Sequence, residues 1–294
     1  MSPRILLSLI VVAFLLLAGA LFAFSPSTLV SGSNGEPSQR IAITWQDASS
    51  DLPPVSGPDD RDLPLVVIDA GHGGRDLGAV GTAPDGGRVF EKDIVLAISV
   101  SLRDKLLETG SFRVAMTRSQ DTIVPLARRP EIARALDADL FVSVHADSAG
   151  LREDVAGASV YTLSNDASSE AAARFAEREN AADRLNGVAI EGQSKEVSAI
   201  LVELSQQFTQ EEAAEFAKLI EREGQSRIAF HPQARRSAAL AVLRAPDVPS
   251  VLLETGFVTN PDDRARLVTE EGREQYAQVL AQAIRVFFAR RADT

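Results

Sequence analysis

Short apolar runs alternate with longer amphipathic stretches along most of the chain. In the stretch 91–107, Ile94, Ile98 and Leu102 recur at helical spacing, whereas 65–70 is a continuous run of mainly aliphatic residues that is typical of a buried strand. We expect strands at 65–70, 112–117, 140–145, 159–163, 239–243 and 251–254. We expect helices at 91–108, 125–136, 169–185, 197–207, 211–223 and 273–290.

This alternation predicts the α/β fold class. Strands that alternate with helices form a twisted, mostly parallel sheet flanked by helices on both faces. Ligands of such folds bind at the carboxyl ends of the strands. Polar residues that directly follow a predicted strand are therefore the first candidates for a functional site.

The N-terminal part of the chain lacks the alternation and indicates export. Residues 5–17 form an apolar run after Arg4, and the small residues Ala18-Gly19-Ala20 follow, as in a cleavable secretory signal. As a helix, residues 5–24 would also reach about 30 Å, enough for an uncleaved membrane anchor. We expect residues 1–24 to be a signal peptide or an N-terminal anchor. Contact with a membrane is expected only through this segment, and only if it is uncleaved.

A change in composition near residue 62 divides a predicted linker from a single predicted domain. Residues 25–62 are rich in Ser, Pro, Gly and Asp and cannot bury a core, so we expect a disordered linker. Residues 63–294 have the length of one α/β domain. Between the third and the last predicted strands the chain is too long for one crossover. The excess, at about 168–230, is rich in Ala and Glu and predicts an inserted helical segment.

Charge and composition exclude several kinds of chemistry. The chain has no cysteine, which excludes disulfides, Cys-ligated zinc, iron–sulfur clusters and thiol nucleophiles. A net charge of −11 argues against a nucleic-acid partner. Any imidazole chemistry must come from the three histidines His72, His145 and His231.

Four residues lie where this architecture places ligands. His72 and His145 lie at the carboxyl ends of predicted strands, Glu254 ends another, and Glu91 begins a helix after a Gly-rich loop. Two imidazoles and a carboxylate suit a catalytic zinc, and a further carboxylate can take a proton from its bound water. Each residue also has an ordinary alternative, such as a hydrogen-bonded histidine or a helix-N-terminal glutamate. Spacing alone does not choose between these interpretations.

Five motifs, in order, resemble those of the zinc-dependent N-acetylmuramoyl-L-alanine amidases, the class of cell-wall hydrolases that includes AmiA, AmiB and AmiC. The motifs are Asp69–Ala79 (DAGHGGRDLGA), Phe90–Asp93, Thr117–Asp121 with Leu126 and Arg129, Ser143–Asp147, and Leu253–Asn260. The resemblance extends from about Leu65 to the C-terminus. Arg134 departs from the family's usual Ala-Asn at this point, which touches a helix end and puts no ligand in doubt.

The resemblance implies that His72, Glu91 and His145 bind one zinc ion and that Glu254 is the catalytic carboxylate. The implied reaction is hydrolysis of the amide between N-acetylmuramic acid and L-alanine of peptidoglycan, in the periplasm, for septal cell-wall splitting during division. Arg118 either pairs with Asp121 in a turn or contacts substrate. His231 has either a surface role or a contact with substrate.

The early part of the inserted segment resembles the regulatory insertion of the division-associated amidases. Residues 170–187 are expected to form a helix ended by Gly187. The resemblance implies that this helix blocks the site until a LytM-type activator moves it, with Glu179 in the open zinc position. The alternative is that Glu179 is a solvated residue on a charged helix. About 40 linker residues are too few for an added wall-binding domain, so we expect recruitment through the signal, the linker or partners.

Two other functions stay open. A zinc peptidase that cuts a different cell-wall amide would use the same metal chemistry. A catalytically silent wall-binding or regulatory homologue would be expected to lose a ligand or the base, whereas His72, Glu91, His145 and Glu254 are all present.

Overall fold

The computed structural model describes residues 52–83, 86–183 and 199–292, without the side chains of 199–207. The chain divides into the units Met1–Trp45 and Gln46–Thr294, and all described residues belong to the second. The predicted signal or anchor and most of the predicted linker lie outside the described residues. Within the described ranges, no helix has the length and apolar character needed to cross a membrane.

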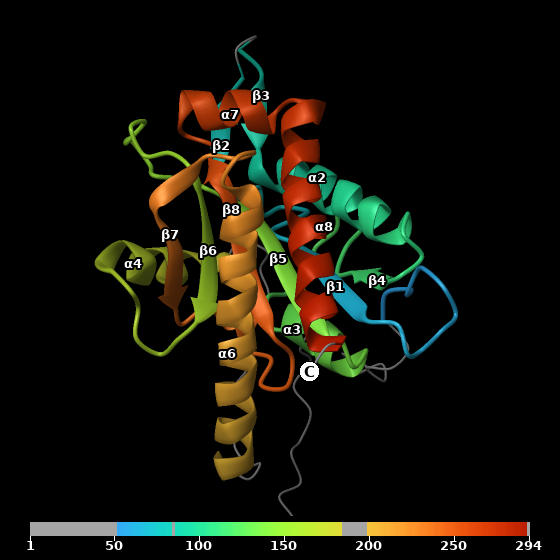
Figure 1. The fold of residues 1–294 in the computed structure, drawn as a ribbon. Helices are drawn as coiled ribbons and strands as arrows, with labels where there is room; N and C mark the ends of the chain where they lie inside the picture. The colour runs from blue at the N-terminus through green and yellow to red at the C-terminus, as the bar shows by residue number, and fades with distance from the viewer. Residues whose placement is uncertain (1–51, 84–85, 184–198, 293–294) are drawn as a thin grey trace, which may run out of the picture. The chain divides into compact units, whose positions relative to one another are not determined.

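A six-stranded sheet with the order β4-β1-β5-β8-β6-β7 forms the centre of the fold (Figure 1). Its strands are β1 (Leu65–Ala70), β4 (Arg113–Met116), β5 (Leu140–Asp147), β6 (Ala158–Leu163), β7 (Phe230–Ala238) and β8 (Ser250–Phe257). The strands β4, β1, β5 and β8 are parallel, and β6 is antiparallel to β8 but parallel to β7. The predicted mostly parallel α/β sheet is therefore confirmed.

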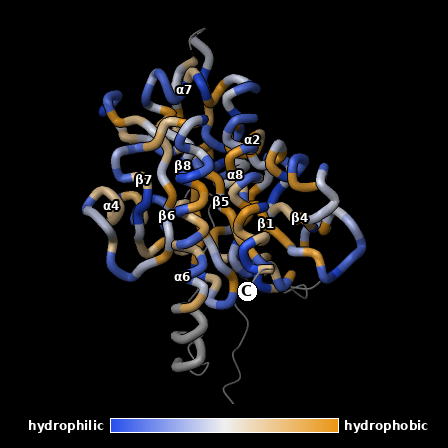
Figure 2. The backbone as a smooth tube through the Cα atoms, in the orientation of Figure 1, coloured by the Kyte–Doolittle hydropathy of each residue, from blue (hydrophilic) through white to orange (hydrophobic). Residues whose placement is uncertain are grey.

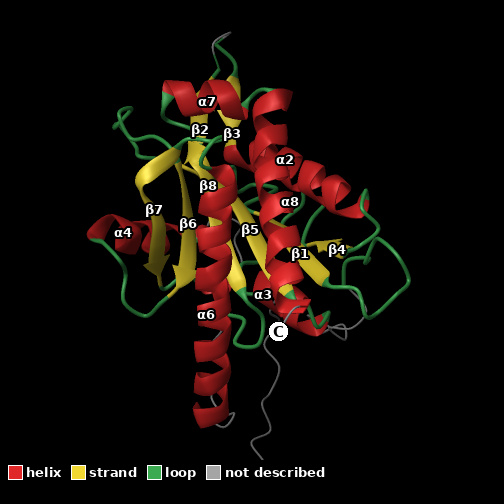
Figure 3. Ribbon diagram, in the orientation of Figure 1, coloured by secondary structure: helices red, strands yellow, loops and turns green. Residues whose placement is uncertain are grey.

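Helices cover both faces of the sheet, also as predicted (Figure 3). One face carries α2 (Glu91–Leu107), α6 (Ala199–Gly224) and α8 (Glu270–Ala292), and the other carries α3 (Arg128–Ala135), α4 (Glu170–Glu179) and the short 3-10 helix η2 (Ala241–Leu243). Two further elements are the helix α7 (Pro261–Leu267) and the hairpin of β2 (Val80–Thr82) and β3 (Arg88–Phe90).

The core has two layers because successive side chains of a strand point to opposite faces. Val66 and Leu253 pack with the α2, α6 and α8 face, whereas Val67, Tyr161 and Leu252 pack with the α4 and η2 face. The strands at the centre of the sheet are mainly apolar, as Figure 2 shows, and their polar residues include Asp69, His145 and Glu254. Burial on both faces explains why these strands appear in the sequence as continuous apolar runs.

The structure corrects the predicted elements in several places. The helix expected at 169–185 ends at Glu179, as α4. The predicted strand at 239–243 ends in the 3-10 helix η2, and the true strand β7 precedes it. β7 lies at the edge of the sheet and carries charged residues, so apolar patterning does not reveal it. The predicted helices at 197–207 and 211–223 are one helix, α6.

Residues 52–62, the last part of the predicted linker, are ordered against the sheet, contrary to the prediction. Ser56 exchanges two backbone hydrogen bonds with Val114 of the edge strand β4, of 2.8 and 2.9 Å. Leu52 packs against the core. Residues 52–62 are therefore part of the folded domain, because the outer edge of β4 offers free backbone groups for pairing.

Two elements were not predicted, although α7 carries a recognisable signal. Asn260 caps α7 by accepting hydrogen bonds from Asp262 and Asp263 backbone N–H groups, and Pro261 occupies the first turn. An Asn-Pro pair of this kind is a common helix start. The hairpin β2–β3 has strands of only three residues each, too short to show an alternating pattern, although the Pro-Asp-Gly-Gly sequence between them is a turn signal.

Candidate metal centre

Two glycines allow the ligand side chains to approach one another. A Cβ on Gly71, which directly precedes His72, would clash with the ring of His145, and a Cβ on Gly78 would clash with Glu91. His72 itself has a positive φ of 59°, which is uncommon for a residue with a side chain. The loop after β1 thus has the backbone conformation needed to turn His72 back toward the end of β5.

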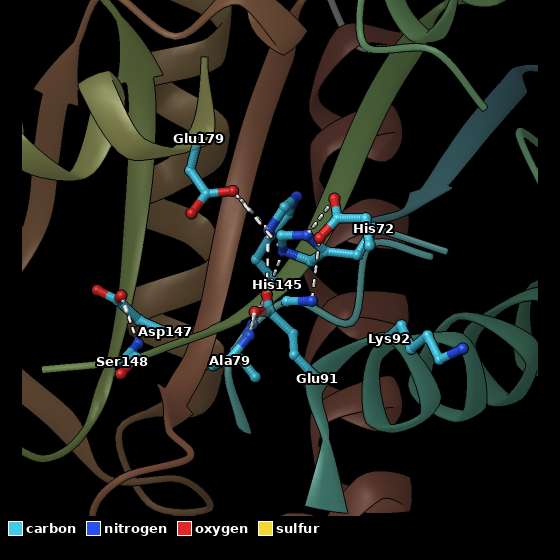
Figure 4. Close-up of polar contacts among 12 residues, drawn as sticks. His72, Ala79, Glu91, Lys92, His145, Asp147, Ser148 and Glu179 are labelled. Carbon is cyan, nitrogen blue, oxygen red and sulfur yellow. Dashed lines mark hydrogen bonds and ion pairs between the residues drawn. The ribbon is translucent and has the colours of Figure 1, made fainter. Parts of the chain in front are cut away.

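Four buried donor atoms from four elements converge at the carboxyl edge of the sheet (Figure 4). Glu91 Oε1 lies 3.0 Å from His72 Nε2 and 3.1 Å from His145 Nδ1. Glu179 Oε2 lies 3.6 Å from each of the same two nitrogens. These separations bracket the edge of about 3.3–3.4 Å of a zinc tetrahedron with bonds of about 2.0–2.1 Å.

The chemistry of the donors also fits a metal ion. His72, His145 and Glu179 each offer a ligand atom within 4.8 Å of the others. Although His72 Nε2 lies 3.0 Å from Glu91 Oε1, it is buried and forms no well-aligned hydrogen bond among the described residues. A buried imidazole nitrogen without a hydrogen bond is costly unless it binds something else. Two imidazoles with carboxylate oxygens form a donor set that suits zinc.

Hydrogen bonds to atoms that do not face the cluster hold the side chains of His72 and Glu91 in position. Asp76 Oδ2 lies 2.9 Å from His72 Nδ1, which leaves Nε2 to face the cluster. Glu91 accepts a hydrogen bond from Ala146 N at 2.8 Å and one from Ala79 N at 2.7 Å. Although burial opposes ionisation, His72 and His145 hold the pKa of Glu91 well below its usual range. Glu91 is therefore an ionised carboxylate in a fixed orientation.

Replacement of Asp76 tests this orienting role. Carboxylates behind ligand histidines contribute about 10–100-fold to metal affinity. We expect Asp76→Asn to weaken metal binding by a factor in this range, measured by competition with a chromogenic chelator. Asp93→Asn, at an exposed position of α2, is the control and should bind metal like the parent. Equal affinities in the two variants would show that Asp76 does not support the metal centre.

Glu254 lies beside this cluster on β8. It is in register with His145 of β5 on one side and with Ser159 of β6 on the other. Glu254 is 1% exposed, and neither of its carboxylate oxygens has a hydrogen-bond partner within the described chain. Burial, followed by the nearby charges of Asp147, Glu91 and Glu179, raises the pKa of Glu254 well above its usual range. A carboxylate with raised proton affinity is suited to general acid–base chemistry.

Glu179 lies on the buried face of α4 and is 8% exposed, so it is not the solvated glutamate of the alternative interpretation. The buried residues of this helix are Ala172, Phe175, Ala176 and Glu179, which share one face by helical spacing. Ser169 caps the N-terminus of α4 by accepting a hydrogen bond from Ala172 N. The amphipathic pattern therefore directs a carboxylate, in the place of an apolar residue, into the cluster.

Polar contacts fix the C-terminal end of α4 above the site. Arg178 Nη2 lies 2.5 Å from Asp147 Oδ1 at the end of β5. The Asn180 side chain donates to Ala239 O at 2.9 Å and accepts from Ala241 N at 2.8 Å. A cavity of about 290 Å³ beside this end is lined by residues that include Arg178, Glu179 and His72. The helix end thus borders the open space that leads to the donors.

Arg118 and His231 lie outside the donor cluster. Arg118 is 3% exposed and donates to the backbone carbonyls of Ala70, Gly71 and Lys92, so it supports the loop that carries His72. Asp121, its expected partner, instead accepts hydrogen bonds from Lys92 Nζ and Gly74 N. His231 is half-buried at the start of β7, with Nδ1 2.7 Å from Arg236 Nη2.

Sequence reasoning missed three residues of the site. Asp76 and Asp147 lie within the motifs, four residues after His72 and two residues after His145. This closeness to the histidines is the feature of the sequence that could have pointed to them. Arg178 had no signal in the sequence, because its contact with Asp147 joins residues 31 positions apart in the chain.

Comparison with known proteins adds independent information. The family model described as N-acetylmuramoyl-L-alanine amidase matches residues 66–286. The chain is 35% identical to the amidase AmiC of Escherichia coli over 83% of this chain and 58% of the relative. It is 38% identical to AmiA of Escherichia coli, over 76% of each chain. The solved structure of AmiC2 from Nostoc punctiforme has 30% identity and a TM-score of 0.54, covering 77% of this chain and 97% of that one.

Proposed function

The chain belongs to the N-acetylmuramoyl-L-alanine amidase family, and from this premise we propose that it hydrolyses the amide between N-acetylmuramic acid and L-alanine of peptidoglycan with the help of one zinc ion. The observation that carries the proposal is the buried convergence of two imidazole nitrogens and two carboxylates beside Glu254. The N-terminal apolar run supports a periplasmic location, and the resemblance to division-associated amidases supports a role in septal wall splitting.

His72, Glu91 and His145 would hold the zinc. When bound there, zinc would supply Lewis-acid chemistry, lowering the pKa of a water molecule toward neutrality and polarising the scissile carbonyl. Glu254 accepts the proton of the attacking water at a carboxylate oxygen and delivers it to the leaving amine of L-alanine. Asp76 and the backbone groups that bind Glu91 keep the ligands in position.

We further propose that the described state is autoinhibited. Glu179 Oε2 occupies the place of a fourth donor, where the substrate and the attacking water have to bind. Arg178 and Asn180 hold the helix end there through Asp147, Ala239 and Ala241. An activator of the LytM type would relieve the block by drawing α4 away from the sheet. The predicted insertion at 168–230 is the part of the chain on which such an activator acts.

Mass spectrometry of the reaction products identifies the bond that is hydrolysed. Purified peptidoglycan sacculi are incubated with the zinc-loaded chain and a stimulating activator, and the released fragments are identified. We expect intact stem peptides with a free L-alanine amine, and glycan strands that retain the lactyl carboxylate. Shortened peptides still attached to the glycan would instead identify a zinc peptidase and overturn the proposed reaction.

A further inference from the structure

Arg236 is a buried cation without an acidic partner in the part of the chain that the structure describes. It lies on β7, is 7% exposed, and donates from Nη1 to the Tyr161 hydroxyl at 3.0 Å and from Nε to Gln233 O at 3.1 Å. Its Nη2 lies 2.7 Å from His231 Nδ1. All three contacts are with groups that carry no negative charge.

A buried guanidinium of this kind is unusual. Removing a charge from water is costly, and buried charges are normally paired with an opposite charge. The other buried arginines of the described domain follow different patterns. Arg129 contacts the carboxylate of Asp69 at 2.7 Å. Arg118 has no carboxylate contact within the described residues either, but it donates to four backbone carbonyls, whereas Arg236 donates to one carbonyl and to two side chains. No acidic side chain among the described residues pairs with the positive charge of Arg236, so a single bound anion could neutralise it.

The Tyr161 hydroxyl extends this anion-binding character. It accepts the hydrogen bond from Arg236 and keeps its own proton available for donation. Burial raises the pKa of Tyr161 to about 12, so the hydroxyl stays protonated at neutral pH. A guanidinium binds a carboxylate through charge-assisted hydrogen bonds, and a neighbouring hydroxyl can donate one more.

The pair lies on the same face of the sheet as Glu254. Glu254 is in register with Ser159 on β6, and Tyr161, two residues further along, is in register with Arg236 on β7. Strand spacings of about 4.8 Å and a rise of about 3.3 Å per residue place the Cα of Arg236 about 12 Å from that of Glu254. An extended peptide covers about 3.3–3.6 Å per residue, so this separation corresponds to about three to four residues.

The helix that blocks the metal donors also covers this pair. The ring of Phe175 stacks on that of Tyr161, with centroids 4.5 Å apart and planes inclined by 28°. Phe175 and Glu179 are both on the buried face of α4, and this helix packs against β7 (Figure 1). Withdrawal of α4 would therefore uncover the metal donors and the Tyr161–Arg236 pair together.

We propose that Arg236 and Tyr161 form a subsite for a carboxylate of the acidic stem peptide, exposed when α4 is displaced. The inference rests on the proposed function, because it needs a peptide cut beside Glu254 and a helix that moves. In the closed state Phe175 occupies the place of the peptide above Tyr161. In the open state the carboxylate lies between the guanidinium and the hydroxyl, and so sets which amide reaches the zinc.

Peptide binding tests the subsite separately from catalysis. The full chain with Phe175→Ala and Glu179→Ala, called here the opened chain, is titrated by calorimetry with a free stem tripeptide and with the same peptide after conversion of its carboxylates to amides. We expect the acidic peptide to bind at least about tenfold more tightly, as a charged hydrogen-bonded pair provides. We expect Arg236→Gln in the opened chain to abolish the difference, and Arg236→Lys to restore part of it.

The controls separate this role from a structural one. Arg235→Gln removes a neighbouring exposed charge of β7 that pairs with Glu221, and it should leave the preference unchanged. Tyr161→Phe keeps the ring and should reduce the preference without abolishing it. Equal binding of the two peptides by the opened chain, or a preference that survives Arg236→Gln, would overturn the subsite. Failure of the proposed function shows in a different assay, as absence of amide hydrolysis from sacculi.

Discussion

Replacement of Glu254 by glutamine is expected to reduce amide hydrolysis by about 10²- to 10⁴-fold, the usual contribution of a general acid–base group. Glutamine has nearly the shape of glutamate but cannot accept the proton of the attacking water. The carboxylate of Glu254 is buried and lacks hydrogen-bond partners among the described residues, so its removal leaves no other group unsatisfied. We expect the variant to fold normally and to keep its metal affinity.

Activity on sacculi, a chelator competition and thermal unfolding together check this prediction. Glu270→Gln, at an exposed position near the start of α8, is the matched control and should match the parent in all three. The Glu254→Gln chain should match the parent in metal affinity and in unfolding temperature only. Retention of more than a tenth of the parent activity would exclude Glu254 as the proton acceptor.

The pH dependence of the reaction provides a second readout for Glu254. Hydrolysis needs the ionised carboxylate, so the rate falls as the pH is lowered through the pKa of Glu254. Burial and the neighbouring acids raise that pKa in the metal-free chain, and the charge of a bound zinc ion would oppose this rise. The acid limb should be present in the parent and absent from the residual activity of Glu254→Gln. An acid limb at the same pH in both chains would contradict this assignment.

Replacement of Glu179 by alanine is expected to raise the basal activity on isolated cell wall by about tenfold or more without any activator. The carboxylate stands 3.6 Å from both ligand nitrogens and excludes the attacking water. If the blocked form holds nine-tenths of the molecules, its loss raises the competent fraction about tenfold. The truncated side chain leaves the fourth position open, although the anchors at Arg178 and Asn180 remain.

A neighbouring glutamate provides the matched control. Glu177 is exposed on the opposite side of α4, and Glu177→Ala should leave the basal activity at the level of the parent. Addition of an activator should stimulate the parent strongly and the Glu179→Ala chain only slightly. A Glu179→Ala chain as inactive as the parent would show that Glu179 does not block the zinc position.

The strands and helices could be predicted where burial leaves a regular pattern. β1, β5 and β8 are buried on both faces, and apolar runs in the sequence reveal all three. β1 has the predicted bounds, whereas β5 and β8 extend two and three residues beyond their predicted ends. β7 could not be predicted in this way, because an edge strand needs few apolar residues and this one carries Arg235 and Arg236. The 3-10 helix η2 is as apolar as a strand, and its true structure depends on its contacts with the α4 face.

For the site, His72, Glu91, His145 and Glu254 were predicted from the family resemblance, which motif residues at strand ends and at a helix start carry. The resemblance of the inserted helix to a regulatory insertion suggested Glu179. Only the tertiary structure brings His72, Glu91, His145 and Glu179 to separations of 3.0–3.6 Å and turns Glu179 inward. It alone reveals the Arg178–Asp147 contact and the uncompensated charge of Arg236. The physical reason is that apolar periodicity and backbone preference are local properties, whereas charge pairing and metal geometry depend on residues that folding brings together from distant parts of the chain.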